Sequence, residues 1–526
     1  MKQHQKEELR SRRDFLRQSA CASLGVTGLV NALAQMRLIT ASMAAGEAGG
    51  NYKAIVCLFL GGGNDANNML VPMGDPTSEE ARADYETARG VLALDRTALH
   101  ALNIPTAAPA TPSKAFEKHY GSSFQSLGVH PDAQPLADMF NSGDLAFISN
   151  VGTLAYPVPT RDDYVNKTVP LPEQLFSHSN QQTQWQSSIA DKPFTSGWGG
   201  RVAELLNASY NSGGNVSMSI SLDGINSFQV GTAGGVSQYV VNPSGTVSLE
   251  GFGTNYSSAY NTAGDPSSGY KDSNTGRRLK AYEDIMKLTH ENLLEDQYNK
   301  IVQRARDAEG AVGAGITAAA ATGVDFDTHF LNAQTKLGDQ LKMVSKLIAG
   351  CTPLGNNRQV FFVQVGGYDT HQSMLSDHSD LMDELSQALL AFRNTLKDPL
   401  LNSFDDVVTF TASDFARTLT PNGENAATDG SDHAWGSHAI VMGGPVKGGD
   451  IYGHYPPLKT GNTPGSIDSH SSRGRLIPDT SVDQYSAVLA DWFGADSNSI
   501  DAIFPNLQRF DDPLNSSTAN MQFIAP

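Results

Sequence analysis

Five continuous runs of apolar residues do most to limit how this 526-residue chain can fold. They read YKAIVCLFL (52–60), LAFISNVG (145–152), RQVFFVQV (358–365), DVVTFTA (406–412) and AIVMGG (439–444). A run without polar alternation is typical of a strand buried on both faces, as in a parallel sheet covered by helices. We therefore expect an α/β fold with a mostly parallel central sheet flanked by helices.

Between these runs, apolar residues repeat with the spacing of a helix. One helix is predicted over 376–396, where an apolar stripe repeats every three or four residues and Ser376 is a plausible N-cap. Two more are predicted over 278–308 and 336–348. Residues 205–275 are instead rich in Gly, Ser, Asn and Thr with short alternating stretches, which indicates a β-rich insertion.

The N-terminus carries paired arginines ahead of a weak apolar segment. The stretch SRRDFLR (11–17) is followed by ACASLGVTGLVNALA, and this order resembles a twin-arginine export signal. The alternative is a basic helix that matches by chance. The apolar segment is too short and too often interrupted to form a stable membrane span. We expect residues 1–46 to be a signal and linker, the twin-arginine translocase to be a partner during export, and the remaining residues 47–526 to form one periplasmic or secreted domain.

Charge and cysteine content exclude several classes of function. The net charge of −18 and the pI near 5.1 argue against a nucleic-acid or anionic-membrane partner. Three scattered cysteines are too few for a disulfide framework or a thiolate metal site.

The first apolar run leads into GGGNDANN (61–68), where Asp65 follows three glycines. A phosphate-binding loop would need a following Lys-Ser or Lys-Thr, and none is present. Asp65 either caps the next helix or is placed at a functional edge of the sheet.

Two further aspartates also follow predicted strands. Asp369 comes after the run 358–365 and Asp414 after the run 406–412. Because the carboxyl ends of parallel strands meet at one edge, Asp65, Asp369 and Asp414 can converge there. Each also has a structural interpretation, in which Asp369 caps a turn and Asp414 pairs with Arg417.

Histidines accompany these acids. His371 lies two residues after Asp369, and His433 and His438 lie in SDHAWGSHAIVMGG before the last run. Aspartate and imidazole without thiolate suit zinc, manganese or another divalent ion. His438 could equally be a core histidine, and His378, near the start of the predicted 376–396 helix, is expected to be structural.

Several motifs together resemble one protein family. They occur in order between residues 52 and 494: GGGNDANN, VHPDAQPLADMFNSGDLAFISNVG, FSHSNQQTQW, GWGGRVAELL, GGYDTH, TASDFART, DHAWGSHAIVMGGPVKGGDIYG and RGRLIPDTSVDQYSAVLADWFG. They resemble the exported bacterial family called domain of unknown function 1501. That family is similar in fold to the alkaline phosphatase, sulfatase and phosphoglycerate mutase superfamily, whose members hold two metals over a hydroxyl or thiol nucleophile. The resemblance implies an alkaline phosphatase-like domain but no substrate.

The resemblance also implies roles for single residues. Asp65 matches the metal aspartate of the first strand, Asp369 with His371 matches an Asp and His that hold one metal, and Asp414 matches the aspartate of a TxDH motif. In this chain Phe415 stands where that motif has histidine. The second site then lacks an imidazole unless His433 replaces it, with His438 as the other histidine, so one or two ions are expected.

The implied nucleophile lies in FSHSNQQTQW. Ser177 aligns with the serine of the family's Ser-His motif and is the candidate nucleophile, while Ser179 is expected to cap the following helix. In the alternative, Ser177 shapes the turn and His178 is the functional residue. Arg417 could hold a leaving oxygen, with Arg161 and Arg201 as weaker anion contacts.

Two functions remain open at this point. The first is an exported metal-dependent hydrolase of phosphate or sulfate esters, acting on a small-molecule or polymer substrate. The second is an exported binding or assembly protein that keeps the fold, and a metal with it, without turnover. The Phe415 departure favours the second, and the retained acids and histidines favour the first.

Overall fold

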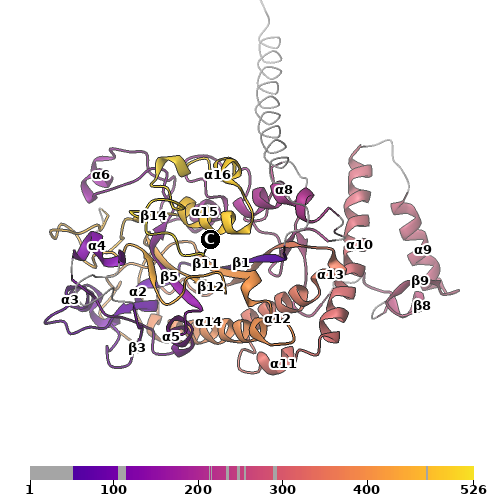
Figure 1. Cartoon of the computed structure of the whole chain (residues 1–526), viewed down its shortest axis with the longest axis horizontal. Helices are drawn as coiled ribbons and strands as arrows, with labels where there is room; N and C mark the ends of the chain where they lie inside the picture. Colours follow the sequence, from indigo (N-terminus) through magenta and orange to yellow (C-terminus); the bar gives the residue numbers. More distant parts are fainter. Residues whose placement is uncertain are drawn as a thin grey trace, which may run out of the picture.

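A computed structural model describes most of the chain (Figure 1). The described residues are 51–525 without 105–113, 122, 213, 215, 233–235, 246–248, 254–255, 288–292 and 470–471. The predicted export signal, including Arg12 and Arg13, lies outside them. Within the described ranges, no helix combines the length and apolar character that a membrane crossing requires.

The core is a nine-stranded sheet with the order β13-β5-β12-β11-β1-β10-β6-β7, and β14 also pairs with β5. All five predicted strands belong to it. Their bounds are β1 Lys53–Leu60, β5 Leu145–Gly152, β10 Arg358–Val365, β11 Val407–Ser413 and β12 Ser437–Met442. The short strands are β6 Ser219–Ser221, β7 Tyr239–Val240, β13 Ile451–Gly453 and β14 Thr480–Ser481.

The sheet is mostly parallel, as predicted, with one exception. β1 pairs in parallel with both β10 and β11, and β12 is antiparallel to β11 and to β5. Leu60 lies opposite Val365 on one side and Ser413 on the other, so the three central strands end level with one another. Because β12 runs the other way, its first residues lie at the edge where its neighbours end.

Helices cover both faces of the sheet, which explains the uninterrupted apolar runs. Alternate residues of β1, beginning with Ala54, face a core that includes α5 Gln134–Asn141, α12 Lys336–Ala349 and α14 Met374–Lys397. The intervening residues, beginning with Ile55, face α8 Trp198–Tyr210, α15 Val482–Phe493 and α16 Ser497–Ile503. Both sets of side chains are buried, so neither face of the strand needs polar residues.

The predicted helices are observed with two corrections. α12 confirms the helix over 336–348, and α14 contains the stripe over 376–396, but α14 begins earlier. Ser376 therefore lies inside the first turn, and the N-cap position belongs to Ser373. The single helix expected over 278–308 is wrong, because α9 Asn274–Met286 ends before α10 Leu293–Ala321 begins.

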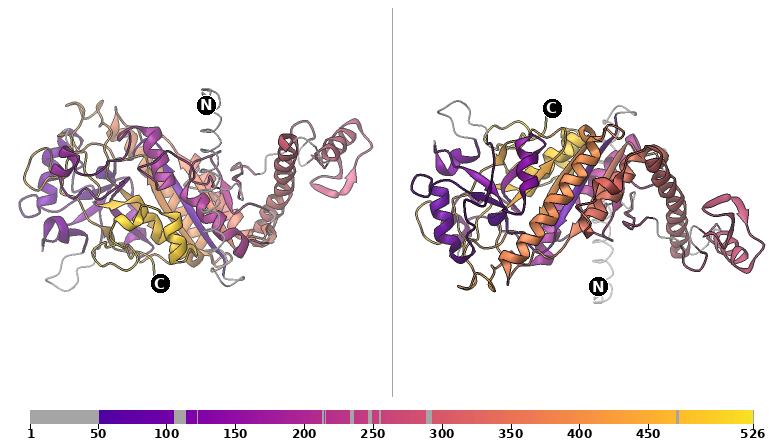
Figure 2. Two further views of the ribbon diagram at one scale, coloured as in Figure 1. Left: turned by 90° about the horizontal axis from the view of Figure 1, so that it is seen from above. Right: turned by 90° about the horizontal axis from the view of Figure 1, so that it is seen from below.

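The segment 205–275 contains less strand than expected. Its first residues complete α8, and β6 and β7 extend the central sheet. Only β8 Tyr260–Thr262 and β9 Asp265–Tyr270 form a separate hairpin. Figure 2 shows this hairpin with α9 standing away from the sheet beyond α10. Phe252, Tyr256, Ala259, Tyr260 and Leu279 form a small core of their own there.

The remaining elements lie mainly around the edges of this core. A small sheet is formed by β2 Leu70–Pro72, β4 Leu127–Val129 and β3 His100–Ala101. The other helices that the argument uses are α2 Ala66–Met69, α3 Glu80–Arg89, α6 Arg161–Asn166 and α7 His178–Ser187.

Candidate metal centre

Four of the predicted metal ligands gather beyond the carboxyl ends of β10 and β11. Asp369 follows β10 and Asp414 follows β11, as expected. His371 lies beside Asp369 in the chain, and His433 comes from the segment before β12, which reaches this edge because β12 is antiparallel. The site described below is built around the carboxylate of Asp369.

His178, the first residue of α7, connects two of the aspartates. Its Nδ1 donates to Asp414 Oδ2 at 2.6 Å, and its Nε2 lies 3.5 Å from Asp369 Oδ2. When the ring carries its one proton on Nδ1, Nε2 presents its lone pair toward Asp369. The imidazole next to Asp414 is therefore His178, and not His433 as one expectation had it.

His433 is oriented by a backbone carbonyl. Its Nδ1 donates to the Phe176 carbonyl at 2.8 Å, and its Nε2 lies 3.3 Å from Asp369 Oδ1. A carbonyl oxygen can only accept, so the tautomer again leaves Nε2 as the free nitrogen. Burial, followed by the nearby positive charge of Arg417, lowers the pKa of His433, although its bond to Phe176 acts in the opposite direction.

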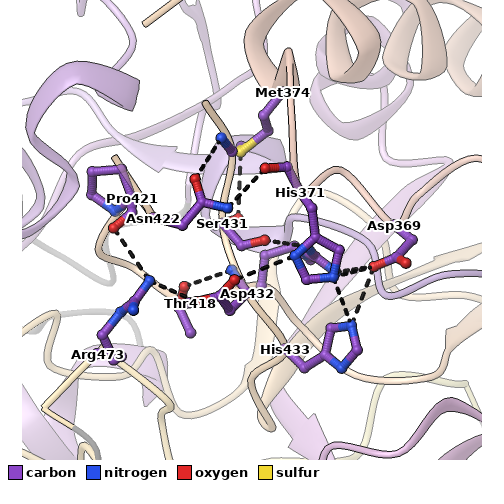
Figure 3. A network of polar contacts seen from close by, with 12 residues as sticks. Asp369, His371, Met374, Thr418, Pro421, Asn422, Ser431, Asp432, His433 and Arg473 are labelled. Atoms are coloured by element: carbon purple, nitrogen blue, oxygen red, sulfur yellow. Dashed lines mark hydrogen bonds and ion pairs between the residues drawn. The ribbon is translucent and has the colours of Figure 1, made fainter. Parts of the chain in front are cut away.

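His371 completes the group of imidazoles (Figure 3). Its Nδ1 lies 3.3 Å from Asp432 Oδ1, and its Nε2 lies 3.1 Å from Asp369 Oδ1 and 3.0 Å from His433 Nε2. Asp432 is held in turn by Arg473, with 2.7 Å between Oδ2 and Nη2. The ring of His371 is thus fixed on the side away from Asp369.

The three rings follow one pattern that suits a metal ion. Each Nδ1 faces an oxygen acceptor, and each Nε2 faces Asp369, which is how metal-binding histidines are commonly oriented. Ligands about 2.0–2.1 Å from a tetrahedral ion lie roughly 3.3 Å apart. The donor pairs His371–His433, His371–Asp369, His433–Asp369 and His178–Asp369 are separated by 3.0–3.5 Å. Among the described residues, His178, Asp369 and His433 have ligand atoms within 4.8 Å of one another, and His371 lies against two of them.

Arg417 is a buried partner of this carboxylate. Its Nη1 donates to Asp369 Oδ1 at 2.6 Å, and its Nη2 donates to the Ser431 carbonyl. The expected structural alternative, a pair with Asp414, is thus corrected to a pair with Asp369. Burial raises the pKa of Asp369, but the hydrogen bond and charge of Arg417 and the nearby imidazoles outweigh it, and the pKa is lowered.

Asp65 is fully buried and pairs with a cation of the protein. Its Oδ2 accepts from Nη2 of Arg89, at the end of α3, and its Oδ1 has no partner among the described residues. Burial, and then the charge of Arg417, lower the pKa of Arg89 to about 9, so it stays charged at neutral pH. The structure brings Asp65 to the expected edge without a described contact to the three imidazoles. His378 lies nearby, is buried, and its Nε2 donates to Asn64 Oδ1 at 3.1 Å.

His438 lies in the core rather than in the cluster. Its Nδ1 accepts from the Asn150 amide at 3.2 Å, and its ring stacks on Tyr455 with 5.4 Å between centroids. Burial lowers its pKa to about 3. This is the structural interpretation that the sequence left open.

The two serines exchange their expected positions at α7. Ser177 is the N-cap residue, without a capping bond from its side chain, and Ser179 lies inside the first turn. Ser177 Oγ donates to Asn180 Oδ1 at 3.1 Å. Ser177 stands between Phe176, whose carbonyl holds His433, and His178, so the backbone places it beside the cluster.

Phe415 and the glycine turn fill the space under the rings. The Phe415 ring lies 4.8 Å from the ring of His178 and 4.6 Å from that of His433. A Cβ on Gly63, at φ +86°, would lie 2.5 Å from this ring, and a Cβ on Gly62, at φ +118°, would lie 2.5 Å from the Asp369 amide. The glycines thus permit close packing of the β1 turn, and the Gly62 amide also donates to Asp414 Oδ1 at 3.2 Å.

The two weaker arginine candidates differ in their surroundings. Arg201 is buried, and its guanidinium donates to the carbonyls of Ile503, Ser196 and Ser187, so it has a structural role. Arg161 is the first residue of α6, and no described contact joins it to the cluster.

Several contributing residues were not predicted. Asp432 immediately precedes His433, and this position in DHAW was the one feature of the sequence that could have placed Asp432 near the site. The Phe176 carbonyl and Arg89 gave no such signal, because a backbone oxygen has no sequence pattern and Arg89 is 24 residues from its partner.

Comparison with known proteins places the chain in a family. No curated protein and no solved structure is significantly similar to it. The model of one family, described as a protein of unknown function (DUF1501), matches residues 52–471, which is most of the chain and includes every donor of the cluster. The chain therefore belongs to the DUF1501 family.

Proposed function

We propose that the chain is a metal-dependent hydrolase of phosphate or sulfate esters, with an alkaline phosphatase-like fold. The observation that carries the proposal is the convergence of three Nε2 atoms on Asp369, each ring being held by an acceptor at Nδ1. In particular, His371 and His433 face each other at 3.0 Å through nitrogens that cannot both hold a proton. A cation bound by both nitrogens would let each Nδ1 keep its proton and donate to Asp432 and to the Phe176 carbonyl.

His178, His371, His433 and Asp369 would hold the ion. Three neutral imidazoles and one carboxylate suit zinc or manganese. When bound, such an ion lowers the pKa of a hydroxyl or water and neutralises charge on a phosphoryl or sulfuryl oxygen. Arg417 fixes the carboxylate, while Asp432 and Phe176 fix two of the rings.

Ester cleavage is supported by what lies next to the donors. Ser177 offers a hydroxyl at the N-terminus of α7, and its side chain leaves the first-turn amides of the helix uncapped. Free amides at a helix N-terminus bind tetrahedral anions. Ser177 is therefore our candidate nucleophile, acting on a small-molecule or polymer ester.

A second function has its own support. The hydroxyl of Ser177 is bonded to Asn180, and Arg417 is occupied by Asp369, so neither is free in this arrangement. These contacts favour an exported binding or assembly protein in which the metal stabilises the fold.

Export is a separate part of the proposal. The SRRDFLR stretch supports delivery by the twin-arginine translocase to the periplasm or beyond. We propose no nucleic-acid partner and no stable membrane span after processing, consistent with the net charge of −18 and the interrupted apolar segment.

One experiment separates hydrolase from binding protein. Protein purified after native export is analysed for bound metal and then assayed with phosphate monoesters, phosphate diesters and sulfate esters, with zinc and with manganese. Turnover that disappears on chelation and returns with metal is the expected result. Bound metal without turnover on any ester favours the binding protein, and absence of metal contradicts both proposals for the site.

A further inference from the structure

We infer that the site holds a single divalent ion and that the guanidinium of Arg89 occupies the place of a second cation beside Asp65. This inference rests on the proposed metal centre. It concerns the three aspartates beyond β11, β1 and β10, each of which has a different set of partners. Only one of them, Asp369, faces the Nε2 atoms of the imidazoles.

Arg89 is fixed completely in its position. Nε donates to Asn68 Oδ1, and Nη1 donates to the carbonyls of Thr418 and Leu419. Nη2 donates to Asp65 and to the sulfur of Met374. All five N–H groups of the guanidinium therefore have partners, and the side chain is 0% exposed. A cation held this firmly leaves no route for Asp65 to exchange it for an ion.

Asp414 is likewise engaged by donors. Oδ1 accepts from the Gly62 amide at 3.2 Å, and Oδ2 accepts from His178 at 2.6 Å and from Gln182 Nε2 at 2.9 Å. The carboxylate is 0% exposed. Asp414 thus orients His178 through Nδ1 instead of offering oxygen to an ion.

The charge balance of the region also favours one ion. Asp65, Asp369 and Asp414 carry three negative charges, and Arg89 and Arg417 return two positive ones. The charges of Asp432 and Arg473 cancel, because the two side chains form an ion pair. With neutral imidazoles, one divalent ion leaves a single positive charge, which suits an anionic ester. Two ions would leave three positive charges beside Asp65 and Asp414, whose side chains are fully buried, which is unfavourable.

The position of Phe415 is a steric reason to expect one ion instead of two. Its ring lies against both His178 and His433 and against the Gly63 backbone, so hydrocarbon fills the space between the glycine turn and the imidazoles. A second ion on this side would find no donor from residue 415.

The stoichiometry of the natively exported protein tests the inference directly. Metal per chain is measured by inductively coupled plasma mass spectrometry and by native mass spectrometry, after dialysis against metal-free buffer and after titration with zinc or manganese. One tightly bound ion per chain is expected. Two ions would overturn the single-ion inference while leaving the proposed centre intact, whereas none would overturn both.

Replacing Arg89 tests its role as the internal cation. In Arg89→Ala the buried Asp65 loses its partner, so we expect a second zinc equivalent to bind and zinc to raise the melting temperature more than in the wild type. Arg82→Ala is the matched control, because Arg82 lies on the same helix and is 3% exposed but is bonded to Glu86 and to backbone carbonyls. A zinc response in Arg89→Ala equal to that of Arg82→Ala would overturn the assignment.

Asp65→Asn provides a test that does not require the loss of a buried guanidinium. Asparagine keeps the shape and an oxygen for Arg89, and Asp65 is not a ligand in our assignment. Metal content is therefore expected to stay at one ion per chain with unchanged zinc affinity. A tenfold or larger loss of zinc affinity in Asp65→Asn would show that Asp65 binds the ion.

Discussion

The Nε2 atoms of His371 and His433 lie 3.0 Å apart, although both rings have their Nδ1 directed at an oxygen acceptor. Two neutral rings in this arrangement would place two lone pairs against each other. The contact is stable only if a proton or a metal ion lies between the nitrogens. A proton there would form an N–H···N hydrogen bond between the two rings, whereas a divalent ion would be bound by both nitrogens.

Replacing a ligand should remove the ion and destabilise the protein. His371→Ala and Asp369→Asn each delete a donor, and a ligand bound only by the native state stabilises it by mass action. We expect loss of bound metal and a lower melting temperature in both variants, measured by metal analysis and calorimetry. Unchanged metal content in both would show that GGYDTH is only a turn.

Asp432 should act on the metal through His371. Asp432→Asn weakens the acceptor at Nδ1, and changes of this kind typically lower metal affinity about 10–100-fold. Competition with a zinc chelator measures the change. Asp429→Asn is the control, because Asp429 lies on the same loop but bonds to Asn425 and Thr428. Equal affinities in the two variants would contradict the role of Asp432.

Arg417 should matter for stability even without metal. Arg417→Met leaves Asp369 without its cation, and breaking a buried ion pair costs about 3–5 kcal/mol. The Asp369 side chain is 45% exposed, so we expect a value near or below the lower end of this range. Urea unfolding of the metal-free protein measures it. Arg417→Lys should recover only part of the loss, since a single ammonium cannot replace the two-nitrogen contact to Asp369 and the Ser431 carbonyl.

The strands could be predicted from sequence because a strand buried on both faces has a local signature. Asp65, Asp369 and Asp414 could be placed at the sheet edge for the same reason, since each follows such a strand. The side chains that these aspartates contact could not be predicted from the sequence. Whether Asp65 meets a metal or Arg89 depends on where α3 packs, and the antiparallel direction of β12, which delivers His433, depends on pairing with β5 and β11.

The buried histidines should make the protein less stable in acid. His438 has a pKa of about 3 in the folded state because it is buried, whereas an unfolded histidine titrates near 6.5. Between these values the unfolded chain binds a proton that the folded chain does not, so stability falls as pH falls. The loss approaches about 1.4 kcal/mol per pH unit for one such group.

His438→Asn tests this contribution. Asparagine can still accept from the Asn150 amide but does not titrate, so the slope of unfolding free energy between pH 6 and pH 4.5 should decrease by about one proton. Denaturant unfolding at several pH values in the metal-free protein measures the slope. His130, whose pKa burial lowers to about 4, contributes with the same sign and remains in both proteins. Equal slopes would show that His438 is protonated in the folded state.

Export should depend on the paired arginines. Replacing Arg12 and Arg13 by lysine keeps the charge but removes the side chains that a twin-arginine receptor is expected to recognise. The double variant should accumulate in the cytoplasm as precursor, detected by fractionation and immunoblotting. Normal processing would reject the twin-arginine assignment and leave the metal centre untouched.

Ser177 and Ser179 should separate catalysis from structure. Ser177→Ala removes the candidate nucleophile beside His178 but no ligand and no capping bond, so metal content and melting temperature should hardly change. If ester hydrolysis is found, this variant should lose most turnover and any covalent intermediate seen by mass spectrometry.

Ser179, which is exposed inside the first turn, is the matched control. Its replacement by alanine should change the stability by less than about 0.5 kcal/mol and leave turnover intact. Full activity in Ser177→Ala would assign the attack to a water molecule and leave Ser177 as the residue that positions Phe176 and His178.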